Sequence, residues 1–246
     1  MSLSAILLAA GYATRLYPLT QDRPKALLSL GEGVILDAVV EAVRSVPSVE
    51  RCILVTNHRF VEQFRAWQHA RHAAITILDD GTSEVNARLG AIRDLELGRV
   101  QGGAAGDVLV VGTDNLFRWS LQEFVTRAQR HRPHPSIALW EAPSKAEATQ
   151  FGVVEIDHEH RIISFEEKPA EPSSALVALC VYYFPQQMCD QIQRFLDEGS
   201  TADAPGYFIR WLVRQNNVYG VTMPGVWYDI GTLETYRTVV AAWPAK

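Results

Sequence analysis

The chain has 246 residues, 48% of them hydrophobic, which is typical of a globular protein with a sizeable buried core. Its formal net charge of −5 and pI near 5.8 argue against broad binding of nucleic acid, because such binding needs a basic face. No apolar stretch is long enough to span a bilayer, and the start lacks the features of a signal peptide, so we expect a cytoplasmic protein that contacts no membrane.

The first part of the chain, residues 1–135, alternates short apolar runs with longer amphipathic segments. This is the pattern of βαβ units around a mostly parallel sheet. The predicted strands cover residues 5–10, 52–56, 74–78 and 108–112, and the predicted helices cover residues 35–46, 59–72 and 121–131. The first helix, for example, is predicted because Ile35, Val39 and Val43 recur at helical spacing.

The second part, residues 136–246, begins with strand-like segments and returns to helix near its end. The predicted strands cover residues 137–141, 152–156, 162–166 and 176–184, and the predicted helices cover residues 187–197, 207–214 and 233–242. No repeat, low-complexity tract or linker separates the two parts. We therefore expect one domain over residues 1–246, in which the second part completes the sheet and builds a smaller lobe.

A loop rich in turn-forming and cationic residues, GYATRLYPLTQDRPK, follows the first predicted strand. Ligands of α/β proteins bind beyond the carboxyl ends of parallel strands, where this loop begins. Gly11 leaves room for a close approach to the backbone, Arg15 offers two parallel N–H donors, and Lys25 offers a compact charge. The loop therefore predicts an anion site, with phosphate as first candidate. The alternative is a strand-to-helix connection whose surface charge is incidental.

The apolar strand in VLVVGTDNLF ends just before Asp114, at the same predicted edge as the opening loop. A carboxylate there can hold Mg²⁺, which prefers oxygen ligands and keeps phosphates and waters in the rest of its shell. The alternative is that Asp114 merely caps a turn or a helix.

Asp229, in the stretch GVWYDIGTLETY, stands among apolar side chains, where a carboxylate needs a partner. A cation shared with Asp114 would supply one. The alternative is that Asp229 caps the last helix, a role for which Thr232 competes. Thr232 is expected to lack a full capping box, because Thr235 stands where such a box has glutamate or glutamine.

The stretch FEEKP places two charged residues at the end of a predicted strand. Lys168 could contact a second phosphate, and Glu167 could accept hydrogen bonds from hydroxyl groups. The alternative is an exposed ion pair at a strand end.

The histidines of HRPH and HEH lack carboxylate or cysteine partners at metal-binding spacing, so we interpret them as surface residues. The three cysteines form no CxxC pair and indicate neither a disulfide framework nor a thiolate metal site.

Together these stretches resemble the sugar-phosphate nucleotidylyltransferases, which include the glucose-1-phosphate thymidylyl- and uridylyltransferases. The similarity extends over nearly the whole chain, through LAAGYATRLYPLT, PKALL, DGTSEVNARLGAI, GTDNLF, FGVVEID, FEEKP, DAPGYFIRWL and WYDIGTLETY. The resemblance implies an α/β fold, a Rossmann-like three-layer sandwich with a mostly parallel mixed sheet and a small β-rich acceptor-binding lobe. It implies that a sugar 1-phosphate attacks the α-phosphate of a nucleoside triphosphate and expels pyrophosphate.

The resemblance also implies roles for individual residues. Residues 1–135 would bind the nucleotide, and residues 136–246 would bind the phosphorylated acceptor and supply the C-terminal helices. The phosphates and the metal would be held as follows: the β and γ phosphates by Arg15, the α-phosphate by Lys25, Mg²⁺ by Asp114 and Asp229, and the sugar's phosphate by Lys168. The nucleotide would also contact Leu8, Ala9, Ala10, Gly11 and Thr14, with a helix edge near Arg88, Leu89 and Gly90. The acceptor would contact Gly152, Glu167 and Cys180.

Three positions depart from the glycine that relatives commonly have, namely Ala13, Thr113 and Cys180. The last two bear on the identity of the acceptor. The nearest alternative is a cytidylyltransferase acting on phosphocholine or a phosphonate. A second alternative is a nucleotide-sugar glycosyltransferase, which would usually show an Asp-x-Asp motif, whereas GTDN offers one aspartate. A third is a nucleotide-binding regulatory subunit without turnover, which would not need these charged residues. The expected partners are a nucleoside triphosphate and a phosphorylated acceptor, and a homo-oligomer is possible.

Overall fold

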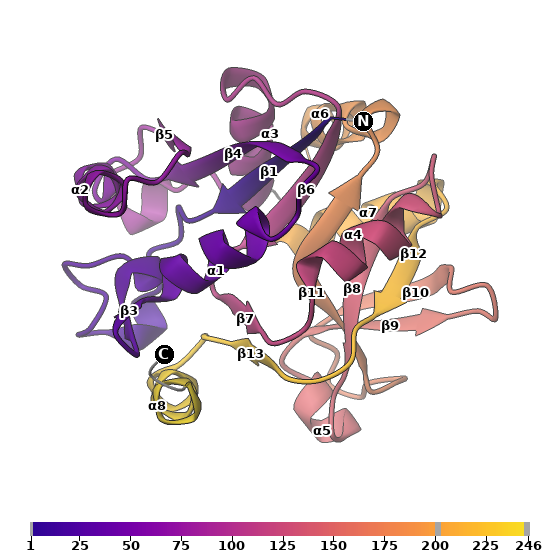
Figure 1. Cartoon of the computed structure of the whole chain (residues 1–246). Coiled ribbons are helices and arrows are strands. Elements are labelled where there is room, and N and C mark those ends of the chain that lie inside the picture. Colours follow the sequence, from indigo (N-terminus) through magenta and orange to yellow (C-terminus); the bar gives the residue numbers. More distant parts are fainter. Residues whose placement is uncertain (1, 200–202, 244–246) are drawn as a thin grey trace.

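The structure is a computed structural model that describes residues 2–199 and 203–243. Its largest sheet contains β1 (Leu3–Leu8), β4 (Val49–Thr56), β5 (Thr76–Asp79), β6 (Asp107–Gly112), β8 (Ser136–Glu141), β9 (Gly152–Ile156), β10 (Ile162–Glu167), β11 (Leu176–Phe184) and β12 (Tyr219–Thr222). The strand order is β10-β9-β11-β6-β1-β4-β5, and β8 pairs with β11 and β12 (Figure 1).

The centre of the sheet is parallel. β1 pairs in parallel with β4 and β6, and β5 continues this parallel part beyond β4. In the register, Leu8 lies between Val55 and Gly112, so the loops that follow these strands leave from one edge. β11 then adds to β6 in the antiparallel direction and links the parallel part to β8 and β9. The sheet is therefore mixed, with a parallel core, and runs through both parts of the chain.

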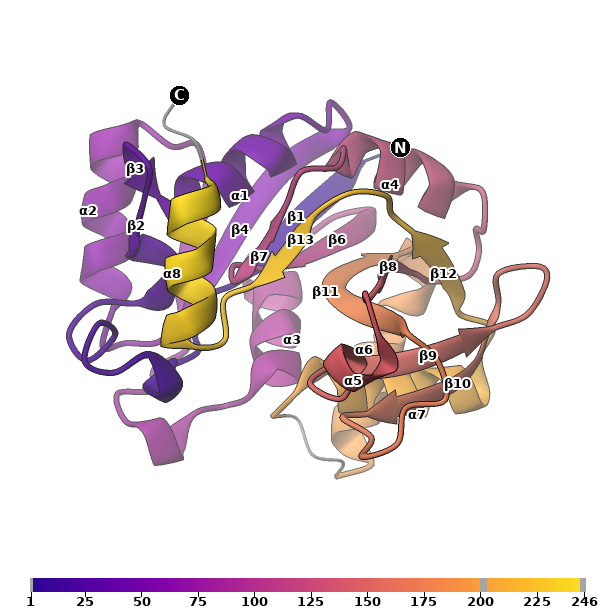
Figure 2. The same ribbon diagram turned by 90° about the horizontal axis from the view of Figure 1, so that it is seen from below.

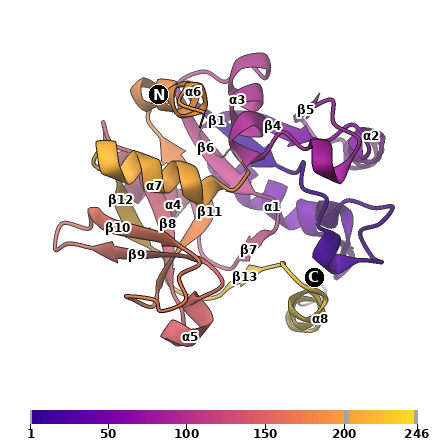
Figure 3. The same cartoon turned by 180° about the vertical axis from the view of Figure 1, so that it is seen from behind.

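Helices cover both faces of the sheet and complete three layers. One face carries α1 (Ile35–Arg44), α2 (Val61–Arg71) and α4 (Leu121–Gln129), and the other carries α3 (Ala91–Gln101), α6 (Asp190–Asp197) and α7 (Pro205–Gln215) (Figures 1 and 3). Successive side chains of β1 divide between the two cores, since Ala5 and Leu7 pack on the first face and Ile6 on the second. The predicted three-layer α/β fold is confirmed.

The second part forms a smaller β-rich lobe beside the parallel core (Figure 2). β9 and β10 are an antiparallel pair, and α7 packs against β10. Two short two-stranded sheets also occur, β2 (Ser29–Leu30) with β3 (Gly33–Val34) and β7 (Asn115–Phe117) with β13 (Trp227–Asp229). The remaining helices are the short α5 (Lys145–Ala148) and the C-terminal α8 (Leu233–Ala242), which lies beside β13.

The start of α8 corrects one expectation from the sequence. The side chain of Thr232 accepts a hydrogen bond from the backbone N–H of Thr235 at 3.1 Å. In return, the Thr235 hydroxyl oxygen accepts from the backbone N–H of Thr232 at 3.0 Å. Threonine therefore closes the reciprocal capping pair that was expected to be incomplete, and Asp229 is not needed as a cap.

Candidate active site

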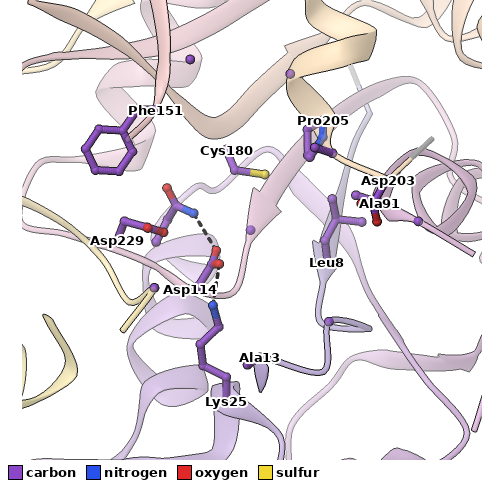
Figure 4. A pocket seen from close by; sticks show the side chains of 18 of the residues that line it. Leu8, Ala13, Lys25, Ala91, Asp114, Phe151, Cys180, Asp203, Pro205 and Asp229 are labelled. Carbon is purple, nitrogen blue, oxygen red and sulfur yellow. Dashed lines mark hydrogen bonds and ion pairs between the residues drawn. The ribbon is translucent and has the colours of Figure 1, made fainter. Parts of the chain in front are cut away.

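A cavity of about 610 Å³ opens at the carboxyl edge of β1 and β6 (Figure 4). Of the residues predicted to form a site, those that line it are Leu8, Ala10, Gly11, Thr14, Arg15, Lys25, Arg88, Gly90, Asp114, Gly152, Glu167, Lys168, Cys180 and Asp229. Ala9 does not, because its side chain packs in the core while its backbone N–H donates to the Val55 carbonyl at 2.9 Å. The nucleotide contact expected along Ala9 stays a prediction, and its neighbours Leu8 and Ala10 line the cavity.

An ion pair between Lys25 and Asp114 lies on one wall. The Lys25 Nζ is 2.8 Å from Asp114 Oδ2 and also donates to the backbone carbonyl of Ile230 at 2.9 Å. The other oxygen, Oδ1, accepts from Asn115 Nδ2 at 2.8 Å. Burial disfavours the ionised form of Asp114, but the Lys25 charge and these hydrogen bonds outweigh burial and lower its pKa. Asp114 is thus held as an oriented carboxylate.

The second carboxylate reaches the same wall from the other end of the chain. β13 pairs with β7 so that Asp229 lies opposite Asn115, and the Ile230 N–H donates to the Asp114 carbonyl at 3.1 Å. Burial and then the Asp114 charge raise the pKa of Asp229 to about 6, although Lys25, Arg15 and Lys168 act against them. Two adjacent carboxylates with this mutual repulsion fit a divalent cation, which would bind both.

The described residues hold no group of three or more His, Cys, Asp or Glu side chains suited to a metal ion. These residues alone therefore do not provide a full set of ligands for a metal ion. A magnesium site of two carboxylates would be completed by phosphates and water, which is how Mg²⁺ is usually bound in phosphoryl-transfer enzymes.

The opening loop leaves space where the first strand ends. Among the described residues, and leaving aside its two chain neighbours, no protein atom lies within 4 Å of a Cβ added at Gly11, so the room that this glycine leaves belongs to the cavity. Ala13 adopts a left-handed conformation with φ of 48°, which explains why glycine suits this position. The Thr20 hydroxyl fixes the turn by donating to the Ala13 carbonyl at 2.8 Å. Arg15 follows in a single 3₁₀ turn, Thr14–Leu16.

Glu167 and Lys168 come from the end of β10. Burial raises the pKa of Glu167, against the influence of the cations Lys168 and Arg210. A Cβ at Gly152 would lie 2.6 Å from the Phe165 ring and 3.3 Å from Glu167 Oε2, so this glycine lets the strand end pack closely. The Lys168 side chain is 52% exposed, and its Nζ is 4.0 Å from Glu167. It therefore retains freedom to contact a ligand.

The two departures that bear on the acceptor have different surroundings. Thr113 is buried, and its hydroxyl donates to the Leu8 carbonyl at 2.8 Å, so it ties β6 to β1 instead of facing the cavity. Cys180 lines the cavity beside Asp114 (Figure 4). Burial raises the pKa of its thiol to about 12, so the thiol is neutral. The Cys180 side chain therefore takes up space and carries no charge.

Arg88 and Asp203 connect the two parts of the chain at the cavity. Their side chains form two hydrogen bonds, Nε to Oδ1 at 2.6 Å and Nη2 to Oδ2 at 2.9 Å. Asp203 also accepts through its backbone carbonyl from the Ala91 N–H at 3.3 Å. Pro205 and Gly206, at the start of α7, line the cavity next to it.

Several further lining residues were not predicted, namely Tyr12, Asp94, Phe151, Tyr182 and Asp203. Asp203 belongs to the stretch DAPGYFIRWL, whose place in the resemblance was a usable signal. No local pattern pointed to Asp94 or Tyr182, because their position depends on how α3 and β11 pack.

Comparison with known proteins identifies the family. The sequence model of the family described as nucleotidyl transferase matches residues 4–245. The chain is 27% identical over 234 residues to the bifunctional protein GlmU of Methanocaldococcus jannaschii, with 93% of this chain and 51% of the relative covered. It is 30% identical over 131 residues to the glucose-1-phosphate adenylyltransferase of Thermosipho melanesiensis, with 52% and 32% covered. The chain thus spans about half the length of GlmU.

The fold is similar to that of a crystal structure of a putative glucose-1-phosphate thymidylyltransferase from Bacillus anthracis. The TM-score is 0.83 at 20% sequence identity, and 98% of this chain and 95% of the other are covered. No helix in the described ranges is long and apolar enough to cross a membrane. The match of the family model over almost all of the sequence means that the chain belongs to the nucleotidyl transferase family.

Proposed function

We propose that the chain joins a sugar 1-phosphate to the α-phosphate of a nucleoside triphosphate and releases pyrophosphate. The observation that carries the proposal is the cavity wall on which Lys25 pairs with Asp114 and Asp229 lies alongside, with the charges of Arg15 and Lys168 acting on it. Three cations and two carboxylates suit a reaction between two phosphates. The family supports nucleotidyl transfer, and the name of the glucose-1-phosphate adenylyltransferase supports a sugar phosphate as acceptor and does not favour the cytidylyltransferase alternative.

The reaction needs charge neutralisation and alignment more than acid–base chemistry. An oxygen of the acceptor phosphate, already anionic, forms a bond to the α-phosphorus, while the bond from that phosphorus to the bridging oxygen of pyrophosphate breaks. No strong general base is required. Lys25 would stabilise the charge that develops at the α-phosphate, and Arg15 would hold the leaving phosphates. Lys168 would hold the acceptor phosphate, with Glu167 and the backbone at Gly152 toward the sugar hydroxyls.

We also propose that Mg²⁺ is required and is held by Asp114 and Asp229. The fit rests on the two neighbouring carboxylates, since burial and then the Asp114 charge raise the pKa of Asp229. When bound, the ion would neutralise phosphate charge and bridge the nucleotide to the protein. Asn115 and Lys25 would orient the Asp114 carboxylate for this role.

The assignment of nucleotide binding and acceptor binding to different parts of the chain is also part of the proposal. Residues 1–135 would bind the nucleotide and residues 136–246 the acceptor, within one domain over residues 1–246. Cys180 would narrow the acceptor subsite. A location in the cytoplasm and a homo-oligomer remain predictions.

The test is a matrix of nucleoside triphosphates against phosphorylated acceptors, read by pyrophosphate release with magnesium present. We expect release only when a nucleotide and a sugar 1-phosphate are both present. Release with phosphocholine or a phosphonate but with none of the sugar phosphates would contradict the proposed acceptor class. A parallel series with excess chelator checks the metal requirement.

A further inference from the structure

A buried acidic side chain without a partner forms part of the cavity wall. Asp94 lies in the first turn of α3 and is 5% exposed, yet it lines the cavity. Its Oδ1 atom is buried and has no hydrogen-bond partner within residues 2–199 and 203–243. Burial, with the Asp80 charge adding to it, raises the pKa of Asp94 to about 7. Burying a polar atom without a hydrogen-bond partner costs folding free energy, and buried polar atoms are therefore nearly always paired. A ligand that donates a hydrogen bond would supply the missing partner.

The packing of α3 places Asp94 at the predicted nucleobase end of the cavity. A Cβ at Gly98 would lie 2.9 Å from the Ile6 side chain and 3.0 Å from that of Val55, so α3 lies directly on β1 and β4. Asp94 is one helical turn before Gly98, toward the carboxyl ends of these strands. Leu8, where β1 ends, also lines the cavity.

This end of the cavity is otherwise mostly apolar or already paired. Its lining includes Leu8, Ala10, Val85 and Ala91. Figure 4 shows Leu8, Ala91 and Asp203 on the opposite side of the cavity from Asp229 and Lys25. The charged side chain of Arg88 at this end already forms two hydrogen bonds to Asp203. A largely apolar slot to which Asp94 presents an unpaired carboxylate oxygen suits a flat ring that carries a hydrogen-bond donor.

We infer that Asp94 determines nucleotide specificity, because its carboxylate accepts a hydrogen bond from an amino group of the nucleobase. This inference rests on the proposed function, since it takes the cavity to be a nucleoside triphosphate site. Cytosine, adenine and guanine carry an exocyclic amino group, which is a donor. A donated hydrogen bond from an amino group favours the ionised form of Asp94, which only accepts. In uracil and thymine the one ring N–H lies between two carbonyl oxygens, and those oxygens would face the ionised carboxylate. The site therefore favours cytosine, adenine or guanine.

The test is to measure dissociation constants of ATP, CTP, GTP, UTP and dTTP for the whole chain by calorimetry at about pH 8, above the pKa of Asp94, with magnesium and without acceptor. We expect at least one nucleotide with an amino-bearing base to bind about tenfold or more tightly than UTP and dTTP, as one well-placed hydrogen bond to a base edge allows. UTP or dTTP binding as tightly as the best of the others would overturn the inference, and so would the absence of binding by all five. This comparison needs no variant.

The variant Asp94→Asn then assigns the preference to one residue. The amide keeps an acceptor oxygen and adds a donor that uracil can use. We expect the preference to fall by about tenfold, mostly through weaker binding of the favoured nucleotide. The matched control is Glu96→Gln, a buried acid on the same helix that is paired with Arg99 and does not line the cavity. An unchanged preference in folded Asp94→Asn would overturn the inference.

The two claims fail separately. A binding preference without pyrophosphate release from any acceptor would contradict the proposed function and support the role of Asp94. Pyrophosphate release that is fastest with UTP or dTTP would support the proposed function and overturn the role of Asp94.

Discussion

At the scale of single residues, the cavity combines side chains that lie far apart in the sequence. Lys25 and Asp114 are 89 positions apart and form an ion pair, and the backbone of Ile230 accepts from the same lysine. Within residues 2–199 and 203–243 the Asp229 carboxyl has no comparable ion pair, and burial and then the Asp114 charge raise its pKa to about 6. In the proposed magnesium site, Asp229 is therefore the residue that we expect to depend most on the bound cation.

The variant Asp229→Asn tests that dependence. It removes one proposed ligand while relieving the repulsion from Asp114, so the fold should be retained and the rate of pyrophosphate release should fall by roughly a hundredfold or more. Circular dichroism and steady-state kinetics over a magnesium series measure the two effects. Near-normal release by the folded variant at low magnesium would rule out the shared metal site.

A substitution at Gly11 should affect nucleotide binding without affecting the stability of the fold. In the part of the chain that the structure describes, an added Cβ would meet no atom within 4 Å beyond its chain neighbours, and the φ of Gly11 is not positive. Gly11→Ala should therefore leave the unfolding midpoint nearly unchanged. The new methyl group would occupy ligand space, so we expect KM for the nucleotide to rise by about tenfold. Gly98→Ala is the matched control, since its methyl would meet Ile6 and Val55 in the core and should reduce stability. An unaltered nucleotide KM in Gly11→Ala would show that the ligand does not approach here.

Asp94 predicts a pH dependence of stability whose sign can be worked out. Its pKa is about 7 in the folded chain, raised by burial and by Asp80, against about 3.9 in the unfolded chain. Between these values the folded state binds more protons than the unfolded state, so raising the pH destabilises the protein. Asp94→Asn lacks this penalty and should be more stable than the wild type at pH 8, with the difference shrinking toward pH 4. Urea unfolding at several pH values measures it.

The control for that experiment is again Glu96→Gln, which loses hydrogen bonds to Arg99 and should be destabilised throughout the range. Lower stability of Asp94→Asn at pH 8 would mean that the carboxylate has a structural partner in solution. A gain in stability would instead fit a residue kept for binding at a cost to folding.

At the scale of elements, sequence patterns predicted what depends on local chemistry. The bounds of β9, β11 and α8 agree with the predicted 152–156, 176–184 and 233–242, and those of the other predicted strands and helices differ by a few residues. α3 was missed because its buried face includes Asp94 and Glu96, which break the apolar period. The pair β7–β13 was missed because short strands that meet across the chain leave no local pattern.

The same limit applies to the candidate site. Motif residues at strand ends could be placed from sequence because parallel strands share an edge. Asp94 could not, since a charged residue inside a helix is normally solvated and only the packing of α3 on β1 and β4 directs it to the cavity. Thr113 is the opposite case. Its motif marked it as a position that bears on the acceptor, but its hydroxyl donates to the Leu8 carbonyl instead of facing the cavity.

The cap of α8 is the element-scale prediction. Thr232→Ala removes the hydroxyl that accepts from the Thr235 N–H, and such a loss costs about 1 kcal/mol of stability. Because α8 packs beside β13, which carries Asp229, we also expect a modest loss of activity. The control is Thr238→Ala, an equally exposed threonine inside α8 whose hydroxyl donates to the Glu234 carbonyl at 3.1 Å and does not cap the helix start. Equal unfolding free energies for the two variants would contradict a role for the cap.

At the scale of the whole molecule, the cavity is built by both parts of the chain. Lys25 and Asp114 come from residues 1–135, and Asp229 comes from residues 136–246. The sheet joins the two parts through β11, and the ion pair between Arg88 and Asp203 joins them again at the cavity. Substrate binding is thus expected to depend on how firmly these two parts are held together.

The Arg88–Asp203 pair allows a direct test of that dependence. Its side chains are 47% and 48% exposed, so its contribution should be small and should weaken with salt. If Asp203 holds Arg88 in position, Arg88→Gln and Asp203→Asn should each raise the nucleotide KM by about threefold to tenfold, and the double variant should be no worse than either single variant. The control pair is Arg161–Asp157, which lies outside the cavity, and its variants should leave this KM unchanged. Steady-state kinetics at low and high ionic strength decide the matter, because additive effects that persist in high salt would mean that the two residues act independently.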